Sequence, residues 1–234
     1  MPGSPILRPS SGQERVLGLV TIGQSPRDDV VSQMLPLLPA VLDIRQVGAL
    51  DGLTPEQIAE LAPGPQDYVL HTRLQDGSAA TVGRERITAL LQDCLKQLQG
   101  EGANPIVLLC TGEFPGLRSD ALLIEPDRLL VNVVRGLRPR RAGVLVPLPS
   151  QIESAAAKWR VLEAEVVFVA ASPYGEQIEL TRAAEELEGH PLDLVVMDCM
   201  GYTLAHRRVV TQATGRPVIL ASRVVARIVG ELVE

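Results

Sequence analysis

PIVLLCTG at Pro105–Gly112 and LDLVVMDCMG at Leu192–Gly201 are the two stretches that decide the fold. Both are apolar runs without strict alternation, which is typical of strands buried on both faces of a parallel sheet. Each run ends in a cysteine with a glycine two residues later, and Cys110 and Cys199 stand 89 positions apart. We therefore predict two similar α/β lobes that face each other. Both cysteines would then lie at the carboxyl ends of strands, where open α/β sheets bind ligands.

Outside these stretches, short apolar runs alternate with longer amphipathic runs along most of the chain. The predicted strands are Val16–Ile22, Val41–Val47, Tyr68–His71, Pro105–Cys110, Ala142–Val146, Val166–Val169, Leu192–Asp198 and Pro217–Leu220. The predicted helices are Arg27–Leu37, Thr54–Leu61, Gly83–Leu98, Glu125–Leu137, Ser150–Val161, Glu176–Leu187, Thr203–Ala213 and Ser222–Leu232. This alternation predicts an α/β fold in which each lobe is a mainly parallel sheet flanked by helices. Residues 1–14, which are rich in Pro, Ser and Gly, are predicted to be a disordered leader.

The composition suits a protein with a substantial core and argues against several classes of partner. Of the 234 residues 46% are apolar, and the net charge is −6. An acidic chain is a poor match for nucleic acid or for an anionic membrane surface, since both require clustered Lys and Arg. No apolar run approaches the roughly 18–20 residues that span a bilayer. The three cysteines form no disulfide framework, so we expect a reducing, cytoplasmic location.

Motifs for metals and cofactors are missing from the sequence. His71, His190 and His206 are the only histidines, and no C-x-x-C or H-x-x-x-H spacing occurs. Neither glycine-rich phosphate motif, G-x-x-x-x-G-K-[ST] or G-x-G-x-x-G, is present. The sequence therefore predicts no metal site and no cofactor.

Cys110 and Cys199 suit acid–base chemistry at carbon. A cysteine between a strand and a following helix lies near helix N–H groups, which favour the thiolate and lower the pKa of the thiol. One thiolate can remove a proton from a carbon next to a carboxylate, and the second thiol can return a proton to the opposite face. The alternative is that the cysteines are small core residues. We expect that simpler role for Cys94, which shares the apolar spacing of its predicted helix.

A second group of residues is expected to hold an anionic ligand. Ser25 is a suitable helix N-cap, with Pro26 at the first helical position. A turn from a strand into a helix can also bind an anion, and Arg27 could bind a carboxylate there through two hydrogen bonds. The segment resembles the elbow G-x-S-x-G of serine hydrolases, but Arg27 replaces its last glycine and argues against that class. The complete predicted binding set is Gly23, Ser25, Arg27, Arg73, Thr111, Gly112, Gly201, Tyr202 and Thr203.

Several members of this set have simpler alternative roles. Arg73 suits a solvated loop equally well, and Thr203 suits a helix cap. His206 lies one turn after Thr203 and would assist Cys199 if it faced the cleft, although a surface histidine is the alternative. Ser172–Tyr174 is predicted to be a plain loop, with a lid over the cleft as the other interpretation.

Four segments carry a family resemblance. The C-terminal stretch Val195–Val233 is similar to the final third of the aspartate/glutamate (hydantoin) racemase superfamily, with its strand–Cys–x–Gly turn, helix, short strand and closing helix. The whole chain resembles the AroM family, a branch of that superfamily. VTIGQSPRDDV at Val20–Val30, LLCTGEFPGL at Leu108–Leu117 and IEPDRLL at Ile124–Leu130 carry this second resemblance.

The resemblance implies two racemase-type lobes, with an active-site cleft flanked by Cys110 and Cys199. It implies that the closing helix returns to the first lobe, so we predict a first lobe of 15–112 plus 215–234 and a second of 113–214. Superfamily activities include racemisation of aspartate, glutamate and hydantoins, isomerisation of maleate and decarboxylation of aryl malonates. Amino-acid racemases commonly have Asn-Thr after the first cysteine, whereas Thr111-Gly112 follows here, which weakens an amino-acid substrate. Relatives often pair, which leaves a homodimer open.

The sequence thus predicts a cofactor-independent racemase or isomerase that acts on a small carboxylate-bearing molecule. Cys110 and Cys199 are its predicted acid–base pair. Two alternatives stay open: a non-catalytic protein that senses a carboxylated metabolite, and a decarboxylase or lyase with a single cysteine as proton donor. A racemase needs both thiols, a decarboxylase needs one, and a sensor needs neither.

Overall fold

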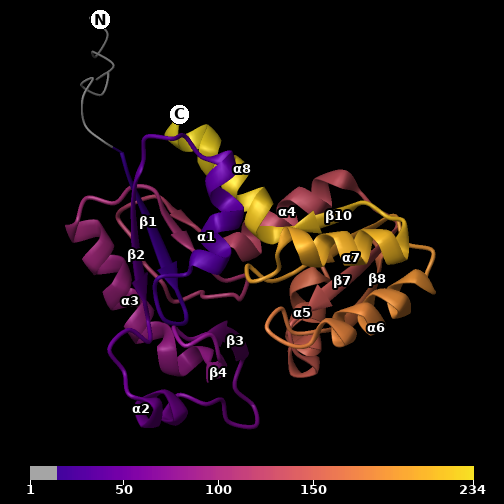
Figure 1. The fold of residues 1–234 in the computed structure, drawn as a ribbon, viewed down its shortest axis with the longest axis horizontal. Helices are drawn as coiled ribbons and strands as arrows, with labels where there is room; N and C mark the ends of the chain where they lie inside the picture. The colour runs from indigo at the N-terminus through magenta and orange to yellow at the C-terminus, as the bar shows by residue number, and fades with distance from the viewer. Residues whose placement is uncertain (1–14) are drawn as a thin grey trace, which may run out of the picture.

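The computed structural model describes residues 15–234 and consists of two α/β lobes that lie side by side (Figure 1). Each lobe is built on a four-stranded parallel sheet. The α/β fold with mainly parallel sheets is therefore confirmed. The predicted leader, residues 1–14, lies outside the described part of the chain.

The first sheet has the strand order β2-β1-β5-β6. Its strands are β1 (Val16–Thr21), β2 (Asp43–Gly48), β5 (Ile106–Leu108) and β6 (Leu123–Ile124). The helices of this lobe are α1 (Asp28–Met34), continued by a 3-10 turn at Leu35–Leu37, and α3 (Arg84–Gly100). Between β2 and α3 the chain inserts α2 (Pro55–Glu60) and an antiparallel hairpin, β3 (Val69–Arg73) and β4 (Ala79–Gly83).

The second sheet has the order β10-β9-β7-β8. Its strands are β7 (Arg141–Val146), β8 (Glu165–Ala170), β9 (Leu194–Met197) and β10 (Val218–Leu220). Its helices are α5 (Ile152–Trp159), preceded by a 3-10 turn at Pro149–Gln151, α6 (Gln177–Glu188) and α7 (Leu204–Thr214). When the four strands of each sheet are numbered in chain order, both sheets have the order 2-1-3-4. The two lobes are therefore pseudo-symmetric, with β1 matching β7 and β5 matching β9.

Helices α4 (Pro126–Leu137) and α8 (Ala221–Val233) join the lobes. Both are strongly amphipathic in sequence, with buried faces such as Val225, Ala226 and Val229 on α8, as expected for helices that pack on one side. Helix α8 contacts α1 and α4 (Figure 1). A side chain at Gly230 would meet the Leu37 carbonyl oxygen at 2.7 Å, so this glycine permits the close approach of α8 to the first lobe. The closing helix thus packs against α1 and the 3-10 turn of the first lobe.

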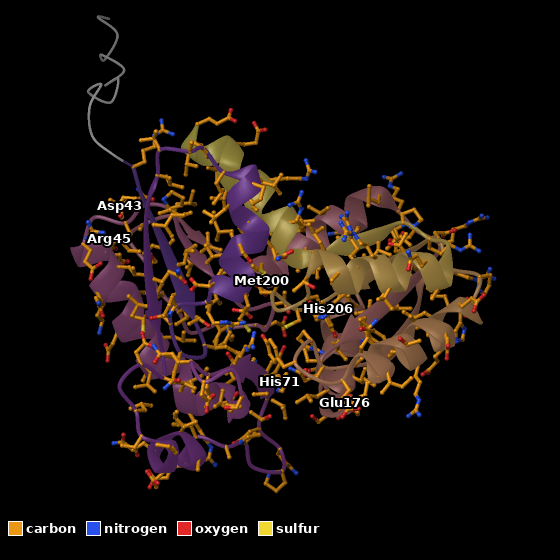
Figure 2. All side chains as sticks on the ribbon, viewed as in Figure 1. Asp43, Arg45, His71, Glu176, Met200 and His206 are labelled. Carbon is orange, nitrogen blue, oxygen red and sulfur yellow. The ribbon has the colours of Figure 1, made fainter. Side chains whose placement is uncertain are left out.

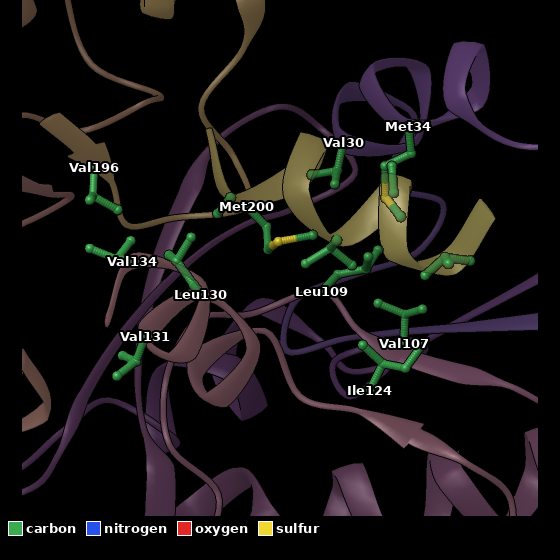
Figure 3. Packing of buried hydrophobic residues seen from close by; sticks show 14 of the residues in the cluster. Val30, Met34, Val107, Leu109, Ile124, Leu130, Val131, Val134, Val196 and Met200 are labelled. Atoms are coloured by element: carbon green, nitrogen blue, oxygen red, sulfur yellow. The ribbon is translucent and has the colours of Figure 1, made fainter. Parts of the chain in front are cut away.

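The largest hydrophobic cluster belongs to both lobes at once. It contains Leu109 from the first lobe, Val196 and Met200 from the second, and Leu130 and Val134 from α4. Figure 3 shows these residues in one packed group. Because the lobes share a core, their relative positions are held by apolar packing as well as by the polar contacts described below.

Several predicted boundaries differ from the structure. Two strands were not expected: β6 has only two residues, and β4 (AATVG) contains small residues that carry little strand signal. The first helix begins at Asp28, with Arg27 rather than Ser25 at its N-cap. No helix follows Cys110 directly, because the chain up to β6 is coil and turn and the next helix begins at Pro126.

Sheet membership bears on the predicted division of the chain into lobes. Strand β6, at 123–124, pairs with β5 of the first sheet. Strand β10, at 218–220, pairs with β9 of the second sheet. By residue number, β6 falls in the predicted second lobe and β10 in the predicted first lobe, so each pairs with the sheet of the other lobe. The division at 112/113 and 214/215 stays a prediction.

Candidate functional site

A small cavity lies between the lobes at the carboxyl ends of the central strands. Its volume is about 40 Å³, and residues of both lobes line it. Room of this size holds about three water molecules. Figure 2 shows His71 and Met200, which both line the cavity, at the junction of the lobes. Cys110 and Cys199 line this same cavity.

The two cysteines have matching local geometry. Each follows its strand by two residues and is 9% exposed. The amide of Gly112 donates a hydrogen bond to Cys110 Sγ at 3.3 Å, and the amide of Gly201 donates one to Cys199 Sγ at 3.4 Å. The strand–Cys–x–Gly repeat noticed in the sequence therefore has the same geometry in both lobes.

Both thiols are protonated at neutral pH, which corrects the expectation of a lowered pKa. Burial raises the pKa of Cys110 to about 12, and the hydrogen bond from the Gly112 amide lowers this pKa by a smaller amount. Burial raises the pKa of Cys199 to about 11, against a smaller lowering by the Gly201 amide. Desolvation outweighs the effect of nearby amides for a buried thiol, and it cannot be read from the position of a cysteine in the sequence.

Arg27 enters the cavity from the turn between β1 and α1 and is only 4% exposed. Its guanidinium donates to both carboxylate oxygens of Asp29, from Nε at 2.9 Å and from NH2 at 2.8 Å. It also donates to the Tyr174 hydroxyl at 2.8 Å. NH1 faces the hydroxyls of Thr21 and Thr72 at 3.3 and 3.5 Å. The two-pronged clamp predicted for a ligand carboxylate is thus formed with Asp29 here.

A buried ion pair lines the opposite part of the site. Lys158 Nζ of α5 lies 2.5 Å from Asp198 Oδ2, and the two side chains are 7% and 2% exposed. The Trp159 indole donates to the same carboxylate oxygen at 2.7 Å. Lys158 also donates to the Thr111 carbonyl at 3.0 Å, and the Thr111 hydroxyl donates to the Asp198 carbonyl at 3.0 Å. This network joins the residue after Cys110 to the residue before Cys199.

The hairpin β3–β4 and the loop after β8 close the cavity. His71 Nε2 lies 2.9 Å from Ser172 Oγ, and the His71 ring lies 5.3 Å from the Tyr174 ring. Burial lowers the pKa of His71, so the ring is neutral at pH 7. Tyr174 lines the cavity, so Ser172–Tyr174 covers the site instead of forming a plain loop.

Six predicted residues do not line the cavity, and four of them have other hydrogen-bond partners. Ser25 bonds the Asp51 carboxylate through its amide at 2.7 Å and its hydroxyl at 2.6 Å. Tyr202 is fully buried, and its hydroxyl donates to the Ala171 carbonyl at 2.6 Å. Thr203 and His206 cap α7 reciprocally, at 3.3 and 3.2 Å, so His206 does not face Cys199. Backbone capping and core burial take up the polar groups that were expected to bind ligand.

The other predicted residues divide between lining and rim. Arg27, Thr111, Gly112 and Gly201 line the cavity together with the cysteines. Gly23 and Arg73 lie outside it. A side chain at Gly23 would meet the Arg73 carbonyl oxygen at 2.5 Å, so this glycine allows β1 and β3 to approach. The Arg73 guanidinium lies 5.8 Å from the centre of the Tyr174 ring, on the outer side of the site.

Lys158, Asp198 and His71 were not predicted from the sequence, and Tyr174 was predicted only as part of a possible lid. Two signals were available: Lys158 is one of only two lysines in the chain, and Asp198 directly precedes Cys199. His71 and Tyr174 carry no comparable signal, because an insertion and a loop bring them to the site.

Two further observations concern residues 15–234. In this part of the chain, no group of three or more His, Cys, Asp or Glu side chains gathers as a metal site would require. Its helices are also too short or too polar to cross a membrane.

Comparisons with known proteins identify the family of the chain and solved structures of similar fold. The family model described as AroM protein matches residues 17–233. No protein of curated function matches the chain. Allantoin racemase from Klebsiella pneumoniae aligns with a TM-score of 0.65 at 12% identity, over 94% of this chain and 88% of that one.

Two other solved structures are similar in the same way. Glutamate racemase isoform RacE1 from Bacillus anthracis has a TM-score of 0.65 at 14% identity, over 93% of this chain and 81% of that one. Unliganded arylmalonate decarboxylase has a TM-score of 0.59 at 16% identity, over 94% and 92%. At these identities the likeness establishes a shared fold.

Proposed function

This chain belongs to the AroM family, and from that premise we propose that it is a cofactor-independent enzyme that moves a proton at a carbon next to a carboxylate. One observation carries the proposal: Cys110 and Cys199, one from each lobe, line a single cavity with the same Sγ–amide geometry. The shared fold supports it, because the similar structures are described as racemases and a decarboxylase.

The proposed reaction balances in two proton transfers. A thiolate at one cysteine removes the proton from the carbon and becomes a thiol, which leaves a carbanion whose charge spreads into the carboxylate. The thiol of the other cysteine then donates its proton to the opposite face of that carbon and becomes the thiolate. The stereocentre is inverted, and the two cysteines have exchanged roles, ready for the reverse direction.

Cys199 is the cysteine that ionises more readily. Burial raises the pKa of both thiols, but that of Cys199 reaches about 11 and that of Cys110 about 12. The rate should therefore rise with pH as Cys199 ionises, up to about pH 11, and fall when Cys110 also loses its proton. The cationic side chains at the cavity, Arg27 and Lys158, supply the positive charge that a carboxylate and its carbanion need.

A specific observation favours a second candidate within the same site. Because both thiols are protonated at neutral pH, each is in the form of a proton donor. A decarboxylase needs only that: loss of CO₂ leaves the carbanion, and one thiol protonates it. The two candidates differ in whether one cysteine or both are required.

Deuterium exchange separates them. Amino acids, hydantoins and small diacids would be incubated in D₂O with the wild type, Cys110→Ser and Cys199→Ser, and followed by NMR and chiral chromatography. Loss of racemisation in both variants supports the two-thiol enzyme. Product formation that one variant alone abolishes supports the decarboxylase. If no compound exchanges or loses CO₂, while one of them raises the melting temperature, the enzyme proposal is wrong and a metabolite sensor remains.

A further inference from the structure

Each lobe contributes one cation to the cavity, from the segment that follows the first strand of its sheet. Arg27 lies just before α1, the helix that follows the first strand of the first sheet. Lys158 lies in α5, the helix that follows the first strand of the second sheet. Each cation has a carboxylate partner in its own lobe, Asp29 for Arg27 and Asp198 for Lys158. Both cations line the cavity that holds the two cysteines.

Lys158 reaches across the cavity to the cysteine segment of the first lobe. Its ammonium group donates to the carbonyl of Thr111, the residue after Cys110, at 3.0 Å. The Thr111 hydroxyl in turn donates to the carbonyl of Asp198. The ammonium is therefore held next to Cys110 by bonds that run between the lobes, and it is 7% exposed, so water screens its charge little.

Arg27 reaches across in the opposite direction. Its guanidinium donates to the hydroxyl of Tyr174, from the loop after β8, at 2.8 Å. That hydroxyl lies against Gly201, because a side chain added there would collide with it. Gly201 is the residue whose amide donates to Cys199 Sγ. The guanidinium is thereby held beside the cysteine segment of the second lobe.

We propose that the lobes exchange their cations: Lys158 of the second lobe is the charge partner of Cys110, and Arg27 of the first lobe is the charge partner of Cys199. Both act as positioning residues that favour the thiolate of the cysteine they face. The catalytic meaning of this arrangement rests on the proposed function, but the arrangement itself does not. Its consequence is that each thiol is activated only while the two lobes are packed together.

The electrostatics of the site agree with this pairing. Besides burial, the charge of Lys158 lowers the pKa of Cys110, while Cys199 and Asp127 raise it. For Cys199, the charge of Arg27 lowers the pKa, while Asp198 and Asp29 raise it. The cation named for each cysteine is in both cases the one from the other lobe.

Thiol alkylation tests the pairing without any substrate. Two background variants each keep one thiol. The variant Cys94→Ala/Cys199→Ser keeps only Cys110, and the variant Cys94→Ala/Cys110→Ser keeps only Cys199. The rate of reaction with iodoacetamide would be measured between pH 7 and 10.5. The thiolate is the form that reacts. At a fixed pH below the pKa, the alkylation rate therefore falls about tenfold when the pKa of the thiol rises by one unit.

The expected result is a crossed pattern. Lys158→Met slows the alkylation of Cys110 about tenfold at pH 9 and changes that of Cys199 less than twofold. Arg27→Met does the reverse. Lys158→Arg and Arg27→Lys restore most of the lost rate, because they return the charge. The proposal is overturned if each cation affects the cysteine of its own lobe, if both thiols respond equally, or if the charge-retaining variants fail to restore the rate.

Controls separate this effect from loosened packing. A purely structural role would expose the thiols and speed up both reactions, with a lower midpoint of urea unfolding. Lys158→Met leaves Asp198 unpaired, so the double variant Lys158→Met/Asp198→Asn is tested as well. We expect it to slow the alkylation of Cys110 as much as Lys158→Met does. Deuterium exchange is scored separately. If the alkylation pattern is crossed but no compound exchanges deuterium, only the proposed function is rejected. If a compound exchanges deuterium but the pattern is not crossed, only the pairing of cations and cysteines is rejected.

Discussion

The two lobes share a strand order and a cysteine turn but differ in what surrounds that turn. In the first lobe, Cys110 is followed by coil, and the inserted hairpin β3–β4 covers it, with Leu70 against Gly112. In the second lobe, Cys199 lies five residues before α7, and the loop bearing Tyr174 covers it. The amides at the start of α7 bond Gln33 and the Thr203 cap instead of the thiol.

This difference shows that a local turn and its environment make separate contributions. The turn determines the hydrogen bond at sulfur, which is nearly identical in the two lobes. The environment determines the pKa, which burial raises to about 12 for Cys110 and to about 11 for Cys199. Equivalent positions in a repeated fold therefore need not have equal acidity. Four experiments test how far the equivalence extends.

The largest effect is expected from the cysteines themselves. Cys110→Ser and Cys199→Ser should each lower the rate of racemisation by about 10²–10⁴-fold, because each removes one general acid or base. The rate would be measured by chiral chromatography on the compound that exchanges deuterium. If Cys110→Ser keeps the full rate, the two turns are equivalent in geometry only.

The carboxylate partners of the two cations should differ in their effect on stability. Asp198→Ala leaves Lys158 charged and buried, so we expect the free energy of unfolding to fall by about 3–5 kcal/mol. Asp29 is 18% exposed, and Asp29→Ala should cost less, about 1–3 kcal/mol.

Urea denaturation measures both changes in stability. Glu165→Ala, which breaks the exposed pair with Arg141, is the matched control and should cost less than 1 kcal/mol. Equal costs for Asp198 and Asp29 would mean that the two buried pairs are energetically equivalent.

The glycines of the two turns should also differ. A methyl group at Gly201 would collide with the Tyr174 hydroxyl, which is held by Arg27, and we expect Gly201→Ala to cost about 1–3 kcal/mol and to weaken ligand binding. At Gly112 the nearest atom is Leu70 Cδ2, the end of a flexible side chain, at 2.6 Å. Gly112→Ala should therefore cost less. The reverse order, measured by thermal unfolding, would contradict a rigid Tyr174.

The smallest effect concerns alkaline pH. The raised pKa of Cys199, about 11, means that its thiol stays protonated in the folded state while it ionises in the unfolded chain near pH 9. The stability that this thiol contributes is complete below about pH 9 and is lost as the pH rises through about 11.

Cys199→Ser should therefore flatten the fall of the unfolding free energy between pH 8.5 and 10.5, by on the order of 1 kcal/mol. The difference between variant and wild type is the quantity to measure, because other groups of the unfolded chain ionise in the same pH range. Identical slopes would indicate that the thiol is more solvated than its burial suggests.

Much of the fold was predictable from the sequence, while the site was predictable only in part. The apolar runs around Val107 and Val195 indicated central parallel strands, and the repeated turns identified both cysteines, because these are local patterns. The short strand β6 and the small-residue strand β4 were missed, since pairing with neighbours and not residue preference makes them strands. Ser25 and Thr203 were assigned to a ligand because a helix cap and an anion site use the same residue types.

By itself the sequence determined the fold class, the two related lobes and the position of a thiol at the end of one strand in each lobe. Only the tertiary structure decided which charges meet those thiols. Arg27 and Tyr174 are 147 positions apart, and Lys158 reaches a carbonyl 47 positions away. Secondary structure follows from periodicity over a few residues, whereas acidity depends on burial and on charges from the other lobe, which no local pattern encodes.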